Sequence, residues 1–145
     1  MRHLPLRTMI LLGLGLLLGG CASFNAQVEH GRSLAGIERF YVVRNLNDNH
    51  AFDHQIVAAL QARGLTAEAG PLTMMPENTQ AIVSFQDHWA WDFRENLVYL
   101  KINIRDTRSE QVFATVTFDA RFPVRLTTAE IVGKLVDRLL QPKAK

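Results

Sequence analysis

The sequence has a single cysteine, Cys21, so no disulfide can form within the chain. Its longest uncharged apolar run, Met9 to Leu18, has ten residues, about half of the roughly 20 that a membrane-spanning helix needs. The remainder of the sequence contains no internal repeat and no low-complexity tract. These absences argue against a disulfide framework, a permanent transmembrane anchor and a repeat architecture, so the fold must depend on its own apolar core.

Motifs of several enzyme classes are also missing, since there is no G-x-S-x-G and no phosphate-binding glycine loop. The carboxylates are scattered, and no spacing singles out an acid–base pair. His50 and His54 have the spacing of two zinc ligands on a helix, but the glutamate of H-E-x-x-H and a third ligand are absent. We therefore predict a protein without catalytic residues, metal or cofactor. A hydrolase whose site residues cannot be grouped from sequence is the alternative.

The first 21 residues follow the layout of a secretory signal peptide. Arg2 and Arg7 form a basic start, the apolar run comes next, and Leu18-Gly19-Gly20-Cys21 places small residues before the cysteine. The chain then turns polar after Phe24, as expected once a signal peptide has ended. The alternative is a secreted protein in which Cys21 is incidental.

Leu18-Gly19-Gly20-Cys21 resembles the lipobox of bacterial lipoprotein precursors. The resemblance implies that residues 1–20 are removed and that Cys21 receives a diacylglyceryl group and an N-terminal acyl chain such as palmitate. Several acyl chains, at roughly 0.8 kcal/mol per buried CH₂, make a stable membrane anchor. Ala22 and Ser23 follow in place of an aspartate, which implies the outer membrane of the cell envelope, with the domain facing the periplasm.

The charge balance changes when the signal peptide is removed. The whole chain has a formal net charge of +2, and its pI is about 9.0. Without Arg2 and Arg7, the basic residues equal the 14 acidic residues in number. A basic surface would favour nucleic acid, so a balanced mature chain gives no reason to expect that partner.

Residues 22–37 show no sustained periodicity and contain Gly31, Ser33 and Gly36, so we expect a flexible tether there. Residues 38–145 have the length of one domain. A chain beginning near Ser33 is expected to fold by itself, without metal or disulfide.

Periodicity predicts the first elements of this domain. Residues 39–44 are rich in β-formers and predict a strand. Phe52, Ile56 and Leu60 share one face of a helix, which residues 47–49 can cap and Gly64 ends. Residues 65–69 form a weakly marked strand, and a proline-containing loop follows.

Residues 81–93, 97–105 and 111–122 alternate apolar and polar side chains, which predicts a three-stranded antiparallel meander with one face in water. Thr127 and Glu130 have the spacing of a capping box at the start of the last helix. The order β-α-β-β-β-β-α predicts an α/β (α+β) two-layer sandwich, with a mostly antiparallel sheet and two amphipathic helices.

A second resemblance rests on Trp89-Ala90-Trp91-Asp92, Tyr99-Leu100 and Asp106-Thr107-Arg108. These segments are similar to small uncharacterised bacterial envelope lipoproteins with a compact α/β domain. The resemblance implies a binding or structural role and carries over no catalytic residue. It favours a domain that binds another envelope protein; the oligomeric state stays open.

Four residues form the candidate binding site: Trp89, Trp91, Asp87 and Tyr99. The tryptophans share the parity of the apolar strand face, so we expect them in the core, Trp89 above all. The alternative is an exposed aromatic platform for glycan or another small ligand. Asp87 shares that parity and needs a partner, such as an arginine, if it is buried.

Overall fold

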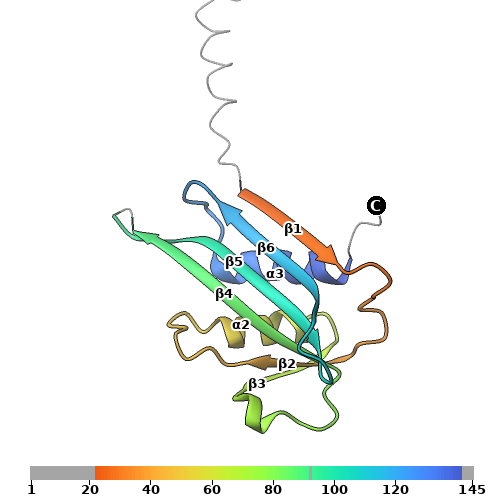
Figure 1. The fold of residues 1–145 in the computed structure, drawn as a ribbon. Helices are drawn as coiled ribbons and strands as arrows, with labels where there is room; N and C mark the ends of the chain where they lie inside the picture. The colour runs from red at the N-terminus through yellow and green to blue at the C-terminus, as the bar shows by residue number, and fades with distance from the viewer. Residues whose placement is uncertain (1–21, 92, 142–145) are drawn as a thin grey trace, which may run out of the picture.

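The computed structural model describes residues 22–91 and 93–141, so the predicted signal peptide and the predicted lipidation site, Cys21, lie outside the described residues. This part of the chain forms one six-stranded sheet in the order β1-β6-β5-β4-β2-β3 (Figure 1). The elements are β1 (Ala22–Val28), β2 (Arg39–Val43), α2 (Phe52–Gln61), β3 (Thr66–Gly70), the short 3₁₀ turn η1 (Leu72–Met74), β4 (Ala81–Trp91), β5 (Glu95–Asp106), β6 (Val112–Ala120) and α3 (Thr128–Leu140).

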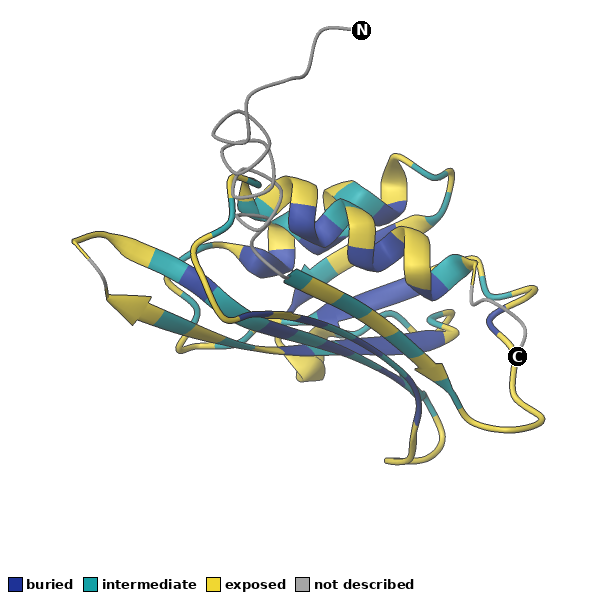
Figure 2. Ribbon diagram, turned by 90° about the horizontal axis from the view of Figure 1, so that it is seen from above, coloured by how far each residue is buried: buried dark blue, intermediate teal, exposed yellow. Residues whose placement is uncertain are grey.

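The predicted α+β class and the mostly antiparallel sheet are confirmed. Strands β1, β6, β5 and β4 pair antiparallel, whereas β2 pairs parallel with both β3 and β4. Both helices lie on one face of the sheet, which gives two layers (Figure 2). The core fills the space between these layers because alternate strand residues point toward the helices. Its largest fully buried side chains are Phe52, Phe118, Ile56, Leu60, Leu100, Ile102, Ile104, Ile131, Leu135, Leu139, Val42 and Val83.

The tether expected over residues 22–37 is wrong for its first part, since Ala22–Val28 form the edge strand β1. This strand pairs with β6 along its whole length, from Ala22 opposite Ala120 to Val28 opposite Ala114. Its even-numbered residues are half-buried and its odd-numbered residues are exposed, the alternation of an ordinary amphipathic strand. The Phe24 ring packs 5.2 Å from the ring of Phe118. The sequence order therefore begins β-β-α, and the described chain enters the sheet at its first residue.

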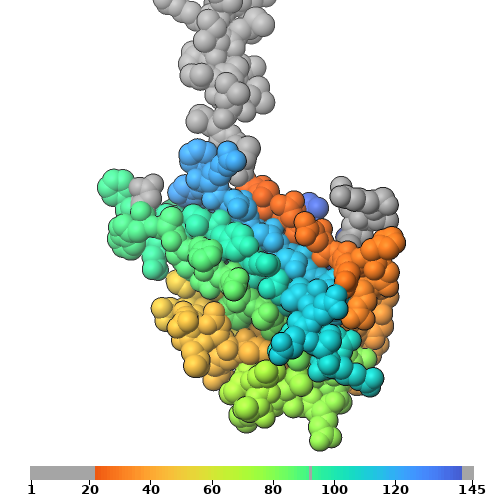
Figure 3. Space-filling view, viewed as in Figure 1, coloured from red at the N-terminus to blue at the C-terminus, as the bar shows by residue number. Residues whose placement is uncertain are grey.

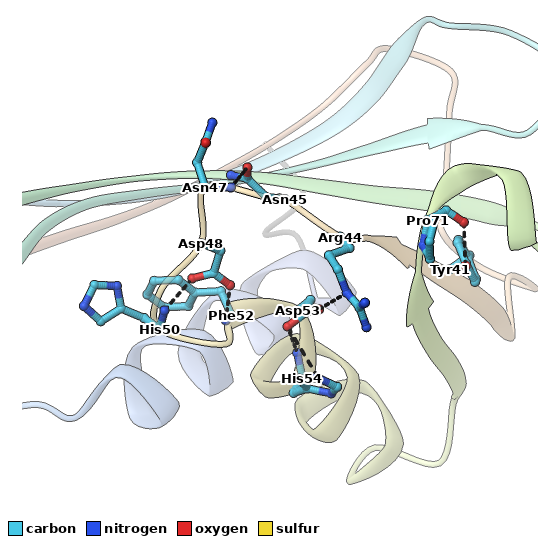
Figure 4. A network of polar contacts seen from close by, with 10 residues as sticks. All are labelled: Tyr41, Arg44, Asn45, Asn47, Asp48, His50, Phe52, Asp53, His54 and Pro71. Carbon is cyan, nitrogen blue, oxygen red and sulfur yellow. Dashed lines mark hydrogen bonds and ion pairs between the residues drawn. The ribbon is translucent and has the colours of Figure 1, made fainter.

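The start of α2 is fixed by Asp48, one of the three residues predicted to cap it. The Asp48 carboxylate accepts hydrogen bonds from the backbone N–H of His50 at 2.8 Å and of Phe52 at 2.6 Å (Figure 4). The N-cap position itself is Ala51, which has a left-handed backbone with φ 55° and no side-chain cap. Asp48 thus holds the turn that carries His50 and buries Phe52 in the core.

The capping box predicted at the start of α3 is confirmed. The Thr127 hydroxyl accepts a hydrogen bond from the backbone N–H of Glu130 at 3.2 Å, and the Glu130 carboxylate accepts one from the Thr127 backbone N–H at 2.7 Å. The Thr127 hydroxyl also donates a hydrogen bond of 2.9 Å to the same carboxylate oxygen. The hydrogen bonds that the carboxylate accepts from Thr127, first from its backbone N–H and then from its hydroxyl, lower the pKa of Glu130. A lowered pKa means that the carboxylate stabilises the folded state when it is ionised.

Replacing this cap gives a first testable prediction. Thr127→Ala is expected to destabilise the domain by about 1 kcal/mol, the usual cost of losing a threonine N-cap. Because the Glu130 pKa is lowered on folding, its contribution is present above the unfolded pKa and lost as pH falls through the folded pKa. The difference between wild type and variant should therefore shrink in acid, measured by urea denaturation at neutral and acidic pH. Thr128→Ala is the control, and a pH-independent difference would contradict this account.

Candidate binding groove

An open groove of about 590 Å³ lies between the β4–β5 hairpin, near its turn, and the segment that leads into α3. Its apolar wall includes Trp89 and Leu97, while Arg94 and Arg125 bring positive charge. The lining residues are Trp89, Arg94, Glu95, Asn96, Leu97, Val124, Arg125, Leu126, Thr127, Thr128 and Ile131. An aromatic ring beside guanidinium and hydroxyl groups can hold a polar or anionic ligand by stacking and hydrogen bonding.

Trp89 is the best-fixed side chain of this groove. Its indole Nε1–H donates a hydrogen bond of 2.7 Å to Oδ2 of Asp87, two residues earlier on β4. The His50 ring stacks on the indole, with 3.7 Å between ring centroids and 18° between planes. The half-buried indole also packs against the core, where its centroid lies 6.2 Å from that of Phe52. These contacts hold the ring in one orientation before any ligand binds.

His50 is in turn held from several sides. Its backbone N–H is bound by Asp48, its carbonyl accepts from Nε2 of Gln55 at 2.9 Å, and its Nε2 lies 3.4 Å from Oε2 of Glu95. His50 comes from the loop before α2, and Glu95 begins β5, so the stack connects the two layers. Sequence reasoning assigned His50 no part in this site, because its contact with Trp89 spans 39 positions and leaves no local pattern.

Asp87 lies on the helix-facing side of β4, opposite Leu100, as the alternation of the strand predicted. It is half-buried, and its partner is the indole N–H of Trp89 rather than an arginine. Residues i and i+2 of a strand share a face, so the partner was two positions away. Trp89 takes this face by the same alternation. A register shift between His88 and Trp89, which leaves Val98 of β5 without a partner on β4, pairs Trp89 with Leu97.

The other two candidate residues do not join this site. Trp91 is 77% exposed, so the expectation of a buried Trp91 is wrong. The β4–β5 hairpin extends beyond both helices, so neither helix covers this end of β4 (Figure 2). Tyr99 pairs with His88 on the helix-free face of the sheet, where their ring centroids are 5.4 Å apart. The structure brings together Trp89 and Asp87 and separates Trp91 and Tyr99 from them.

The two helix-spaced histidines also have different surroundings. The His54 side chain is 69% exposed, and its Nε2 lies 3.9 Å from Oδ1 of the buried Asp53. The other carboxylate oxygen of Asp53, Oδ2, lies 3.5 Å from Nε of Arg44. His50 and His54 lie apart and point in different directions (Figure 4). Within the part of the chain that the structure describes, no group of three or more His, Cys, Asp or Glu side chains could hold a metal ion.

No protein-family model matches the chain, and no curated protein sequence is similar to it. Its fold is similar to that of PelC from Paraburkholderia phytofirmans, solved as a dodecamer both for PelC itself and for a variant of it with a single substitution. Both comparisons have a TM-score of 0.58 and cover 84% of this chain and 96% of PelC, at 15% and 14% identity. At these identities the likeness shows a shared α+β fold.

A minor lipoprotein from Acinetobacter baumannii is a more distant structural neighbour. Its TM-score is 0.31 and its identity 8%, with 71% of this chain and 79% of that chain covered. Within residues 22–91 and 93–141, no helix has both the length and the apolar character needed to cross a bilayer.

Proposed function

We propose that this chain is a lipid-anchored lipoprotein of the bacterial outer membrane, facing the periplasm. Its domain is a non-catalytic module that binds another envelope protein. The observation that carries the anchor is Leu18-Gly19-Gly20-Cys21, in which the sole cysteine follows a basic start, an apolar run and small residues. Because β1 begins at Ala22, lipid on Cys21 would hold the edge of the sheet directly at the bilayer.

The geometry of the groove supports a binding role, because the Trp89 indole that lines it is held in one orientation. The face of the His50 ring is covered by Trp89, and its Nε2 faces Glu95, whose side chain is 58% exposed. His50 therefore packs against the indole and holds it in place, and it is not one of the residues that line the groove. The fold likeness to PelC, which was solved as a dodecamer, makes a second copy of this chain one candidate for the protein partner.

The groove itself favours a second candidate function, the binding of a glycan or another small polar ligand. Trp89 lines the groove, and its orientation is already fixed by Asp87 and His50. Sugar rings stack on such indoles, and Arg94 and Arg125 would add hydrogen bonds to acidic or hydroxylated groups.

The lipid anchor is tested by Cys21→Ser. We expect the variant to incorporate no labelled fatty acid and to accumulate as an unprocessed precursor, because serine offers no thiol for the diacylglyceryl group. Cells are grown with radioactive palmitate, and the label in the purified protein is compared between wild type and variant. Ser23→Ala is the control and should keep the label. Label retained by Cys21→Ser, or absent from the wild type, would refute the anchor.

A further inference from the structure

Three aromatic side chains are exposed at one end of the molecule. Trp91 is 77% exposed, Phe93 98% and Phe122 64%. They are the only aromatic residues among the exposed large hydrophobic side chains of the described part of the chain. The exposed aliphatic ones are Leu46, Leu72, Met74 and Val112. Single exposed apolar residues are common on proteins, but a group of aromatic rings at one end indicates an interaction surface.

The register of the sheet places these rings at the end where the described chain begins. Ala22 pairs with Ala120, two residues before Phe122. Tyr99 pairs with Asp119, so the tip of the β4–β5 hairpin extends past the same end of β6. Figure 1 shows the start of β1, the end of β6 and this hairpin at one end of the molecule, and Figure 3 shows that they lie on its surface.

Phe93 is the most exposed of the three and has an unfavourable backbone. Its φ of 57° lies in the left-handed region, which costs energy for a residue with a side chain. The ring has almost no contact with its own domain to offset this cost, because nearly its whole surface is exposed. Contact with an apolar environment outside the domain would offset it.

Exposed arginines accompany the aromatic rings. Arg94 follows Phe93 in the hairpin, and Arg121 precedes Phe122. Two exposed carboxylates, Glu95 and Asp119, lie nearby, and Glu95 faces His50. Aromatic rings next to basic side chains are typical of surfaces that lie at the headgroup level of a bilayer, where the rings enter the interface and the cations meet anionic lipid.

We propose that this aromatic end rests on the lipid bilayer, with Trp91, Phe93 and Phe122 in the interface and Arg94 and Arg121 on anionic headgroups. The proposal rests on the anchor proposed for Cys21, which is bonded to Ala22 at this same end. With β1 starting at Ala22, the anchor brings this end to the membrane without an intervening linker. The bilayer contact orients the domain and turns the opposite end, which carries η1, toward the periplasm.

The orientation is tested with an environment-sensitive fluorophore, nitrobenzoxadiazole, attached to single added cysteines. The full chain is expressed with Phe93→Cys or, as the control, Met74→Cys in η1 at the opposite end (Figure 1). Met74 is also largely exposed, at 72%. The proteins are purified from membranes and reconstituted in vesicles of phosphatidylethanolamine and phosphatidylglycerol. We expect a blue shift and a several-fold rise in emission at position 93, and no change at position 74.

Each result is decisive because acylation of Cys21 is read separately, from the mass of the N-terminal peptide and from labelling of the wild type. Acylated protein without a shift at position 93, or with equal shifts at both positions, overturns the membrane contact and leaves the anchor. If Cys21 is not acylated, the anchor fails. The contact is then judged by adding vesicles to the same labelled proteins, with the wild-type signal subtracted. A shift confined to position 93 supports the contact, and its absence overturns it.

Discussion

A chain that begins at Ser33, and so lacks β1, is expected to lose about 3 kcal/mol of stability, a large share of the 5–15 kcal/mol that holds an ordinary domain together. The loss comes from the burial of Phe24, worth about 1–2 kcal/mol, and from the other half-buried side chains of β1, which also pack against the core. This reverses the expectation, drawn from sequence, that the domain is complete without residues 22–32.

The comparison uses two chains, one beginning at Ala22 and one at Ser33, measured by urea denaturation and thermal melting. The shorter chain should melt at a much lower temperature or show no cooperative transition, because β6 becomes an unprotected edge and Phe118 loses the ring that packs on it. In the longer chain, Phe24→Ala should be destabilising, whereas Asn25→Ala, on the exposed side of β1, should be nearly neutral. Equal stability of the two chains would show that β1 contributes nothing to the fold.

Trp89→Ala is expected to cost about 2–4 kcal/mol, somewhat less than emptying a fully buried aromatic site, because the indole is half-buried. The variant loses contact with the core and the stack with His50, and Asp87 loses its hydrogen-bond donor. Trp91→Ala, two residues along the same strand, should change stability by no more than about 0.5 kcal/mol.

One urea denaturation curve for each variant separates the two tryptophans. Trp89→Phe is a further control, which keeps an aromatic ring but removes the indole N–H. Its loss of stability should lie between that of Trp89→Ala and that of Trp91→Ala. If Trp89→Ala costs no more than Trp91→Ala, the indole does not support the fold, and its contacts with His50 and Asp87 have no energetic weight.

Local patterns in the sequence determined most of the architecture. The alternation over residues 81–122 predicted the meander, because period-two burial is a property of each strand by itself. The capping box of Thr127 and Glu130 and the apolar stripe behind it predicted α3 for the same reason, since cap and stripe lie within a few residues of each other. The strand β1 has the same alternation, but it spans only seven residues and is followed by the glycines Gly31 and Gly36, so the sequence by itself predicted a tether there.

The binding groove depended on contacts that only the tertiary structure decided. The His50 ring that stacks on Trp89 comes from the loop before α2, 39 positions away. The pairing of Trp89 with Leu97 follows from a register shift between His88 and Trp89, which the alternation of the sequence does not reveal. Trp91 has the parity of a core residue and is exposed, because burial requires a helix above the strand and the hairpin extends beyond both helices. Sequence determines which face of a strand a side chain takes, whereas the packing of the other layer determines whether that face is covered.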